Sequence, residues 1–97
     1  MYHLLTGFIP SELGWLTNLK HLVLYSNLLT GSIPSELGLL INLKGFYLMF
    51  NSLTGTIPNE VCELRDDNGG NLGDLGADCE VVCPCCTLCC VYGVGCY

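Results

Sequence analysis

Hydrophobic and polar positions recur along the first two-thirds of the chain with a period of 24 residues. The stretch LTGFIPSELGWLTNLKHLVLYSN at 5–27 returns with substitutions as LTGSIPSELGLLINLKGFYLMFN at 29–51. A third copy begins as LTGTIPNEVCEL at 53–64, and cysteines then replace the pattern. A fixed period of this length is typical of solenoid proteins, in which each unit stacks on the next and neither buries its apolar face alone.

The second half of each unit carries the spacing L-x-x-L-x-L-x-x-N. Alternation at Leu22 and Leu24 predicts a short strand with both leucines facing the core, and copies stacked at this period would pair in parallel. Asn27 and Asn51 stand where the chain leaves the strand. Because an asparagine amide both donates and accepts hydrogen bonds, we expect an asparagine ladder that satisfies the backbone of these turns. Surface turn residues are the alternative interpretation.

The first half of each unit reads L-T-G-x-I-P followed by S-E-L-G-x-L. The glycine permits a tight bend, the isoleucine can point inward from a second extended segment, and the proline ends strand pairing. Residues 11–16 and 35–40 predict one helical turn each, capped by Ser11 or Ser35. Leu13 and Leu16, three positions apart, would share the buried face of the first turn.

The complete pattern LTGxIPxELGxLxxLxxLxLxxN resembles the plant-type leucine-rich repeat of receptor-like kinases, receptor-like proteins and secreted polygalacturonase inhibitors. The resemblance covers residues 1–64. It implies an α/β horseshoe-type leucine-rich-repeat solenoid, curved and right-handed, with short parallel β-strands on the concave face and 3₁₀ or short helical turns on the convex side. It also implies an extracellular location, secreted or in the ectodomain of a membrane protein, and a role in recognition.

Two full units, 5–28 and 29–52, lie between partial ones. Met1 falls at the repeat position of Tyr25 and Met49, and His3 falls at that of the asparagines, so the chain begins inside a repeat. We therefore expect further upstream repeats of a longer chain, with self-association through the open leucine edge as the alternative. The predicted domains are leucine-rich repeats over 1–64 and an irregular Cys-rich C-terminal cap over 65–97.

Aligned without a gap, the third unit loses the strand pattern. Two leucines, an aspartate and a glycine then fall at the positions of Leu43, Phe46, Leu48 and Asn51; they are Asp67, Gly70, Leu72 and Leu75. The two leucines can still fill the last core layer.

All eight cysteines follow residue 61: Cys62, Cys79, Cys83, Cys85, Cys86, Cys89, Cys90 and Cys96. Their even number and the extracellular family favour disulfides, whose connectivity the sequence leaves open. Plant-type domains close with a cysteine pair, and Cys62 replaces Gly14 and Gly38 of the earlier units, so a Cys62–Cys79 bond is one expected pairing. The alternative function is a metal-thiolate site for zinc or copper in this cluster; the favoured interpretation has no metal and no cofactor.

The net charge of −6 excludes nucleic acid as a partner, because no basic patch exists to neutralise phosphates. Residues 81–97 are uncharged, but one proline, two glycines and six cysteines make them a poor spanning helix. Asp66, Asp67, Asn68 and Asp74 lack the order of a calcium loop and read as a polar turn. No catalytic motif is present, so the sequence predicts a noncatalytic protein.

Binding is therefore expected on the concave face. The outward positions of the two predicted strands carry aromatic and apolar residues that differ between copies: His21, Val23, Tyr25 and Ser26 in one, Tyr47, Met49 and Phe50 in the next. Such residues are enriched in interface anchors, so we expect a protein or peptide ligand there.

Overall fold

A computed structural model of the chain describes residues 5–97, so the expectations for Met1 and His3 lie outside it. The elements follow in the order β1 (Thr6–Phe8), η1 (Ser11–Trp15), β2 (His21–Val23), β3 (Leu28–Gly31), η2 (Ser35–Leu39), β4 (Gly45–Tyr47), β5 (Ser52–Leu53), α1 (Asn59–Cys62), η3 (Asp66–Asn68), β6 (Asp74–Asp78), β7 (Leu88–Val91) and β8 (Gly95–Cys96). The η elements are 3₁₀ turns, in line with the fold class that the sequence predicts.

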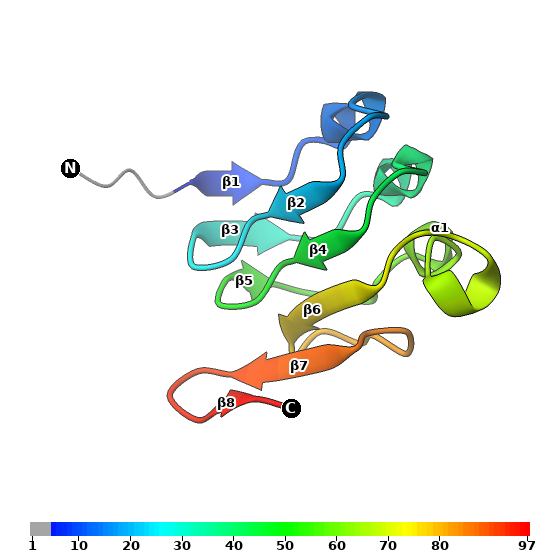
Figure 1. Cartoon of the computed structure of the whole chain (residues 1–97). Coiled ribbons are helices and arrows are strands. Elements are labelled where there is room, and N and C mark those ends of the chain that lie inside the picture. Colours follow the sequence, from blue (N-terminus) through cyan, green and yellow to red (C-terminus); the bar gives the residue numbers. More distant parts are fainter. Residues whose placement is uncertain (1–4) are drawn as a thin grey trace.

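Two sheets run along the stack of repeats (Figure 1). The larger has the strand order β2-β4-β6-β7-β8 and forms the concave face, and the smaller has the order β1-β3-β5. Pairing is parallel throughout both sheets except for β7 with β8, which form an antiparallel hairpin. Each repeat thus passes from the small sheet through a helical turn to the concave strand, and the core lies between these three sides.

The predicted inward leucines form that core. Leu22 and Leu24 are buried beneath β2, and Phe46 and Leu48 are buried beneath β4. The three isoleucines of the L-T-G-x-I-P motifs are buried as well: Ile9, Ile33 and Ile57. The burial of the other leucines depends on their place in the stack. Leu40 is fully buried, whereas its equivalent Leu16, at the open edge of the described chain, is 52% exposed.

The helical turns differ from the prediction in one respect. Pro10 and Pro34 hold the N-cap positions, and neither Ser11 nor Ser35 caps the turn; each hydroxyl contacts the carboxylate of the following glutamate instead. Proline fits this place because its fixed φ suits the extended N-cap conformation, with φ of −69° at Pro10 and −66° at Pro34, and because it has no N–H to leave unpaired.

The glycine inside each turn permits close stacking of the repeats. A Cβ on Gly14 would lie 2.3 Å from the carbonyl oxygen of Glu36, and a Cβ on Gly38 would lie 2.6 Å from the Cβ of Glu60. Both contacts are shorter than van der Waals contact. Glycine at this position therefore marks a turn with another repeat packed directly on it.

The third repeat does continue into the concave sheet, but it is longer than the first two. His21 pairs with Gly45, 24 positions on, whereas Gly45 pairs with Asp74, 29 positions on. The ungapped alignment was therefore wrong by five residues, and Leu75 takes the place of Phe46. The sheet runs across the predicted boundary at residue 64.

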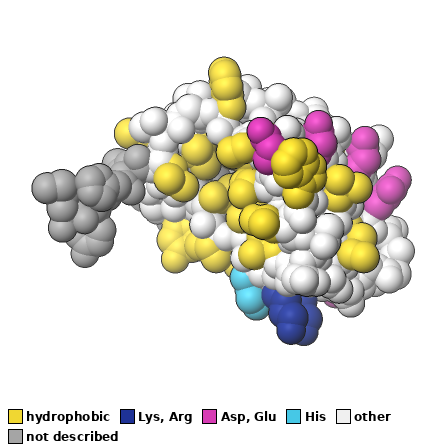
Figure 2. Space-filling model, turned by 90° about the horizontal axis from the view of Figure 1, so that it is seen from above, with side chains coloured by type: hydrophobic (Ala, Val, Ile, Leu, Met, Phe, Trp, Pro, Cys, Tyr) yellow, Lys and Arg dark blue, Asp and Glu magenta, His cyan; other side chains and the backbone are white. Residues whose placement is uncertain are grey.

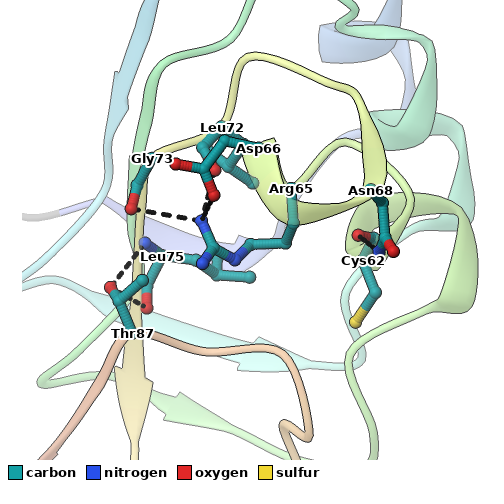
Figure 3. Close-up of polar contacts among 8 residues, drawn as sticks. All are labelled: Cys62, Arg65, Asp66, Asn68, Leu72, Gly73, Leu75 and Thr87. Atoms are coloured by element: carbon teal, nitrogen blue, oxygen red, sulfur yellow. Dashed lines mark hydrogen bonds and ion pairs between the residues drawn. The ribbon is translucent and has the colours of Figure 1, made fainter.

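The extra residues form a loop that Arg65 holds in place (Figure 3). Its Nη1 donates to the carbonyl oxygens of Leu72 and of Gly73, the latter at 3.1 Å, and lies 3.0 Å from Oδ1 of Asp66. On the cap side, the Thr87 hydroxyl accepts a hydrogen bond from the N–H of Leu75 and donates one to its carbonyl. These bonds connect the insertion and the cap to the start of β6.

Four disulfides join all eight cysteines: Cys62–Cys85, Cys79–Cys89, Cys83–Cys86 and Cys90–Cys96. The predicted Cys62–Cys79 pair is wrong, because Cys62 bonds to Cys85 and Cys79 bonds to Cys89. Helix α1 and the end of β6 lie at opposite ends of the concave strands (Figure 1). Cys62 ends α1, whereas Cys79 follows β6 and donates its N–H to the Cys90 carbonyl at 3.0 Å. Within residues 5–97, no helix is long and apolar enough to cross a membrane.

Candidate functional site

The concave face exposes the side chains of alternate positions in β2 and β4. His21, Val23 and Tyr25 are exposed, the latter two at 51% and 50%, and Tyr47 is half-buried. Alternation in the strands directs the intervening leucines into the core and these residues outward. Four of the seven predicted ligand-binding residues therefore share one surface.

Three titratable side chains meet on this surface above Gly45. A Cβ on Gly45 would lie 2.9 Å from the Tyr47 hydroxyl oxygen and 3.0 Å from Nδ1 of His21, so both side chains lean over the glycine. The Tyr47 hydroxyl donates to Oδ2 of Asp74 at 3.3 Å. Asp74 belongs to this cluster although the sequence placed it in a polar turn; its role depends on the five-residue insertion, which no spacing rule reveals.

Burial raises the pKa of the Tyr47 phenol above its ordinary value, and the charge and hydrogen bond of Asp74 raise it further. The Asp74→Asn variant is expected to lower the Tyr47 pKa toward the ordinary value, because it removes the negative charge that opposes ionisation. Burial, the largest cause, remains, so the return would be partial. The measurement is an absorbance titration of tyrosinate, with Tyr47→Phe subtracted to isolate this phenol from the other four tyrosines. An unchanged or higher pKa in Asp74→Asn would contradict the contact.

Met49 is placed differently from the prediction. Its side chain is only 7% exposed, and its terminal methyl lies 2.4 Å from where a Cβ on Gly76 would stand, next to Leu88 of β7. The cap adds β7 beside β6, and Leu88 and Met49 together cover the space above the glycine. Met49 therefore belongs to the packing between the repeat and the cap rather than to an open binding surface.

Ser26 and Phe50 also leave the concave face. Both have positive φ, 59° and 63°, where the strand turns toward the small sheet. The Asp78 carboxylate supports the second turn by accepting hydrogen bonds from the N–H groups of Phe50 at 2.7 Å and Asn51 at 3.1 Å. Both residues then line a groove at the turn edge.

Asn27 and Asn51 bind backbone of their own turn and of the neighbouring repeat. Oδ1 of Asn27 accepts from the Leu5 N–H at 2.8 Å, and Oδ1 of Asn51 accepts from the Leu29 N–H at 3.1 Å. Each Nδ2 donates to strand carbonyls, which for Asn51 include Leu24 at 2.8 Å and Leu48 at 3.0 Å. These are ladder bonds, so the asparagines hold the scaffold that carries the site.

A second row of asparagines escaped the sequence analysis. Nδ2 of Asn42 donates to the Thr17 carbonyl at 2.8 Å, and Nδ2 of Asn71 donates to the Ile41 carbonyl at 3.1 Å, each bond joining adjacent repeats before the concave strand. The signal was available, since Asn18 and Asn42 are one repeat period apart.

The cysteine cluster offers no thiolate in this structure. All eight sulfurs are bonded in pairs, and among residues 5–97 no three His, Cys, Asp or Glu side chains are grouped to hold a metal ion. Zinc and copper bind the thiolate form of cysteine, which a disulfide removes. The metal-thiolate alternative thus lacks its ligands in the oxidised chain.

Comparison with known proteins identifies the repeat. The profile of the Leucine Rich Repeat family matches residues 18–40 and 42–64. No curated protein matches the chain.

One similar solved structure is the leucine-rich-repeat ectodomain of the plant membrane receptor kinase GASSHO1/SCHENGEN3 from Arabidopsis thaliana, in complex with CASPARIAN STRIP INTEGRITY FACTOR 2. It is 38% identical over 77% of this chain, with a TM-score of 0.61. The chain spans 9% of the length of that ectodomain chain.

Proposed function

The chain belongs to the leucine-rich-repeat family in its plant-type form, and from this premise we propose that it is a noncatalytic module that binds a protein or peptide through its concave face. The observation that carries the proposal is the surface formed by His21, Val23, Tyr25 and Tyr47 on the parallel concave sheet. The similar receptor ectodomain, solved with CASPARIAN STRIP INTEGRITY FACTOR 2, supports a protein or peptide partner.

The chemistry of this surface suits a polypeptide ligand. Val23 and Tyr25 offer apolar and aromatic area, and the His21, Tyr47 and Asp74 cluster offers donors and an acceptor a short distance away. Hot spots in protein interfaces usually combine aromatic side chains with a few polar groups.

Acidic and basic side chains are separated on the face that is seen from above (Figure 2). Viewed from above, acidic side chains form a row along one side, and Lys, Arg and His side chains lie on the opposite side (Figure 2). The three glutamates in the first turns, Glu12, Glu36 and Glu60, are exposed. These glutamates lie on the helical turns rather than on the concave strands, where Asp74 is the acidic side chain of the cluster.

We place the protein outside the cell, as a secreted protein or as part of an ectodomain. Four disulfides persist in oxidising compartments and are rare in the cytosol. Further upstream repeats of a longer chain remain part of the proposal, because the similar ectodomain is far longer.

The binding face can be tested with peptides selected from a random display library against the oxidised 97-residue protein. A selected peptide is added to the ¹⁵N-labelled chain, and amide shifts are followed by NMR. We expect the largest shifts in β2 and β4. Tyr25→Ala should weaken binding about tenfold or more, as for an aromatic anchor at an interface centre.

Trp15→Ala is the matched control. Trp15 is an aromatic residue on η1 with 73% exposure, on a turn outside the concave sheet. Its removal should leave the affinity unchanged. Loss of binding in Trp15→Ala with normal binding in Tyr25→Ala would move the site to the convex side and refute the proposal.

A further inference from the structure

A groove of about 620 Å³ lies at the edge where the concave strands turn toward the small sheet. It is bounded by the turns at Ser26–Leu28 and Phe50–Ser52 and by the cap segments that follow β6 and β7. The concave cluster of His21, Tyr47 and Asp74 is absent from its lining, so the groove is a separate site. A concave space of this volume is in the range of ligand pockets.

Two aromatic rings form one wall. Phe50 and Tyr92 pack edge to face, with ring centroids 6.1 Å apart and planes at 80°. Tyr92 is nevertheless 88% exposed, at the tip of the hairpin between β7 and β8. The exposed ring presents a negative π face, which attracts a cation within about 6 Å of its centre.

The charge of the groove has one sign. Asp78 and Glu80 line it, and no Lys, Arg or His of the described chain does. Asp78 is fixed by two backbone N–H groups, whereas Glu80 is exposed and has no hydrogen bond or ion pair among residues 5–97. Because Glu80 has no basic partner among residues 5–97, its charge is available to an incoming cation.

We propose that this groove binds a peptide segment in which a Lys or Arg lies next to an apolar residue. The cationic group contacts the Glu80 carboxylate and the face of Tyr92, and the apolar neighbour packs against Phe50 and Val91. Two features select this occupant: the acidic lining on a chain of net charge −6, and the exposed aromatic and aliphatic wall. The inference does not rest on the concave face being a binding site.

The probe is the blocked tetrapeptide acetyl-Ala-Arg-Leu-Ala-amide, titrated into the ¹⁵N-labelled oxidised protein. We expect saturable amide shifts centred on residues 78–80 and 91–93 and on the turn at 50–52. The matched acetyl-Ala-Glu-Leu-Ala-amide should produce none at equal concentration, and added salt should weaken the arginine peptide.

Glu80→Gln is expected to weaken the arginine peptide about fivefold, the loss that corresponds to one exposed ion pair. Tyr92→Ala tests the aromatic wall and should also weaken it, and neither exposed residue carries the fold. Glu36→Gln, an exposed glutamate outside the groove, is the control and should leave the affinity unchanged. No shifts at the groove, equal shifts with the glutamate peptide, or equal loss in Glu36→Gln would each overturn the assignment.

Discussion

Replacing Cys62 and Cys85 together by alanine is expected to lower the free energy of unfolding by about 3 kcal/mol. The bond links residues 23 positions apart and ties α1 to the cap. In the chain-entropy model, closing a loop of this length removes that much freedom from the unfolded chain. The measurement is denaturant unfolding without reductant, so that the other three disulfides stay intact.

Cys83→Ala with Cys86→Ala is the matched control. This disulfide spans three positions in the same segment, so the same model assigns it about 2 kcal/mol. The Cys62 pair should therefore destabilise the protein more than its neighbour does. An equal or smaller loss for the Cys62 pair would show that α1 is held to the cap by packing alone.

Asn51→Ala is expected to cost about 3 kcal/mol, because one amide serves several backbone groups at once. Its removal leaves the Leu29 N–H and the carbonyls of Leu24 and Leu48 without their partner at a half-buried turn. Asn51→Asp should be similarly harmful at neutral pH, since a carboxylate accepts hydrogen bonds but donates none. Denaturant midpoints with an unchanged m-value measure both effects.

Asn42→Ala provides the comparison within the second asparagine row. Asn42 makes a single side-chain bond, to the Thr17 carbonyl at an exposed site, so its loss should cost about 1 kcal/mol. Equal losses at Asn42 and Asn51 would contradict the central role given to the ladder at the end of the concave strands.

The repeat fold was predictable because each unit carries the same residue types at the positions that pack in the core or turn the chain. Leu22 and Leu24 had to face one side of a strand, and the glycines at 7, 31 and 55 adopt φ of 85°, 82° and 85°, which side chains rarely tolerate. Because these residues recur at a fixed period, the sequence predicts which positions of successive repeats are stacked on one another. The parallel register of β2 with β4, in which His21 pairs with Gly45, follows from it. In the small sheet Thr6 pairs with Leu28 rather than with its repeat equivalent Thr30, so that register is shifted by two residues from the period.

The features that the sequence analysis missed lie where the period breaks. The insertion before β6 shifts Asp74 and Leu75 by five positions relative to the ungapped alignment. Asp74 thereby joins the concave cluster. Met49 packs beside Leu88 of β7, a strand that the repeat pattern does not predict. Ser26 and Phe50 left the concave face because the chain turns there with positive φ, a conformation that strand alternation does not predict.

Cys62 occupies the repeat position at which the earlier units have Gly14 and Gly38. The earlier units have glycine there because the next repeat packs against the turn, as at Gly14 and Gly38. In α1 the cap, rather than another repeat, lies next to this position, so a side chain is accommodated there. Cys62 uses this space to bond to Cys85. The sequence indicated that Cys62 pins the cap, but the partner depended on which end of the strands the cap cysteines occupy.

The most direct test of the account is non-reducing cleavage of the oxidised protein after glutamate. Cuts after Glu60, Glu63 and Glu80 place Cys62 in fragment 61–63, Cys79 in 64–80, and the remaining six cysteines in 81–97. The Cys62–Cys85 and Cys79–Cys89 bonds predict one species in which all three fragments stay linked. Fragments 61–63 and 64–80 joined to each other, with 81–97 released, would mean that Cys62 bonds to Cys79 and that the cap does not close the repeats as described.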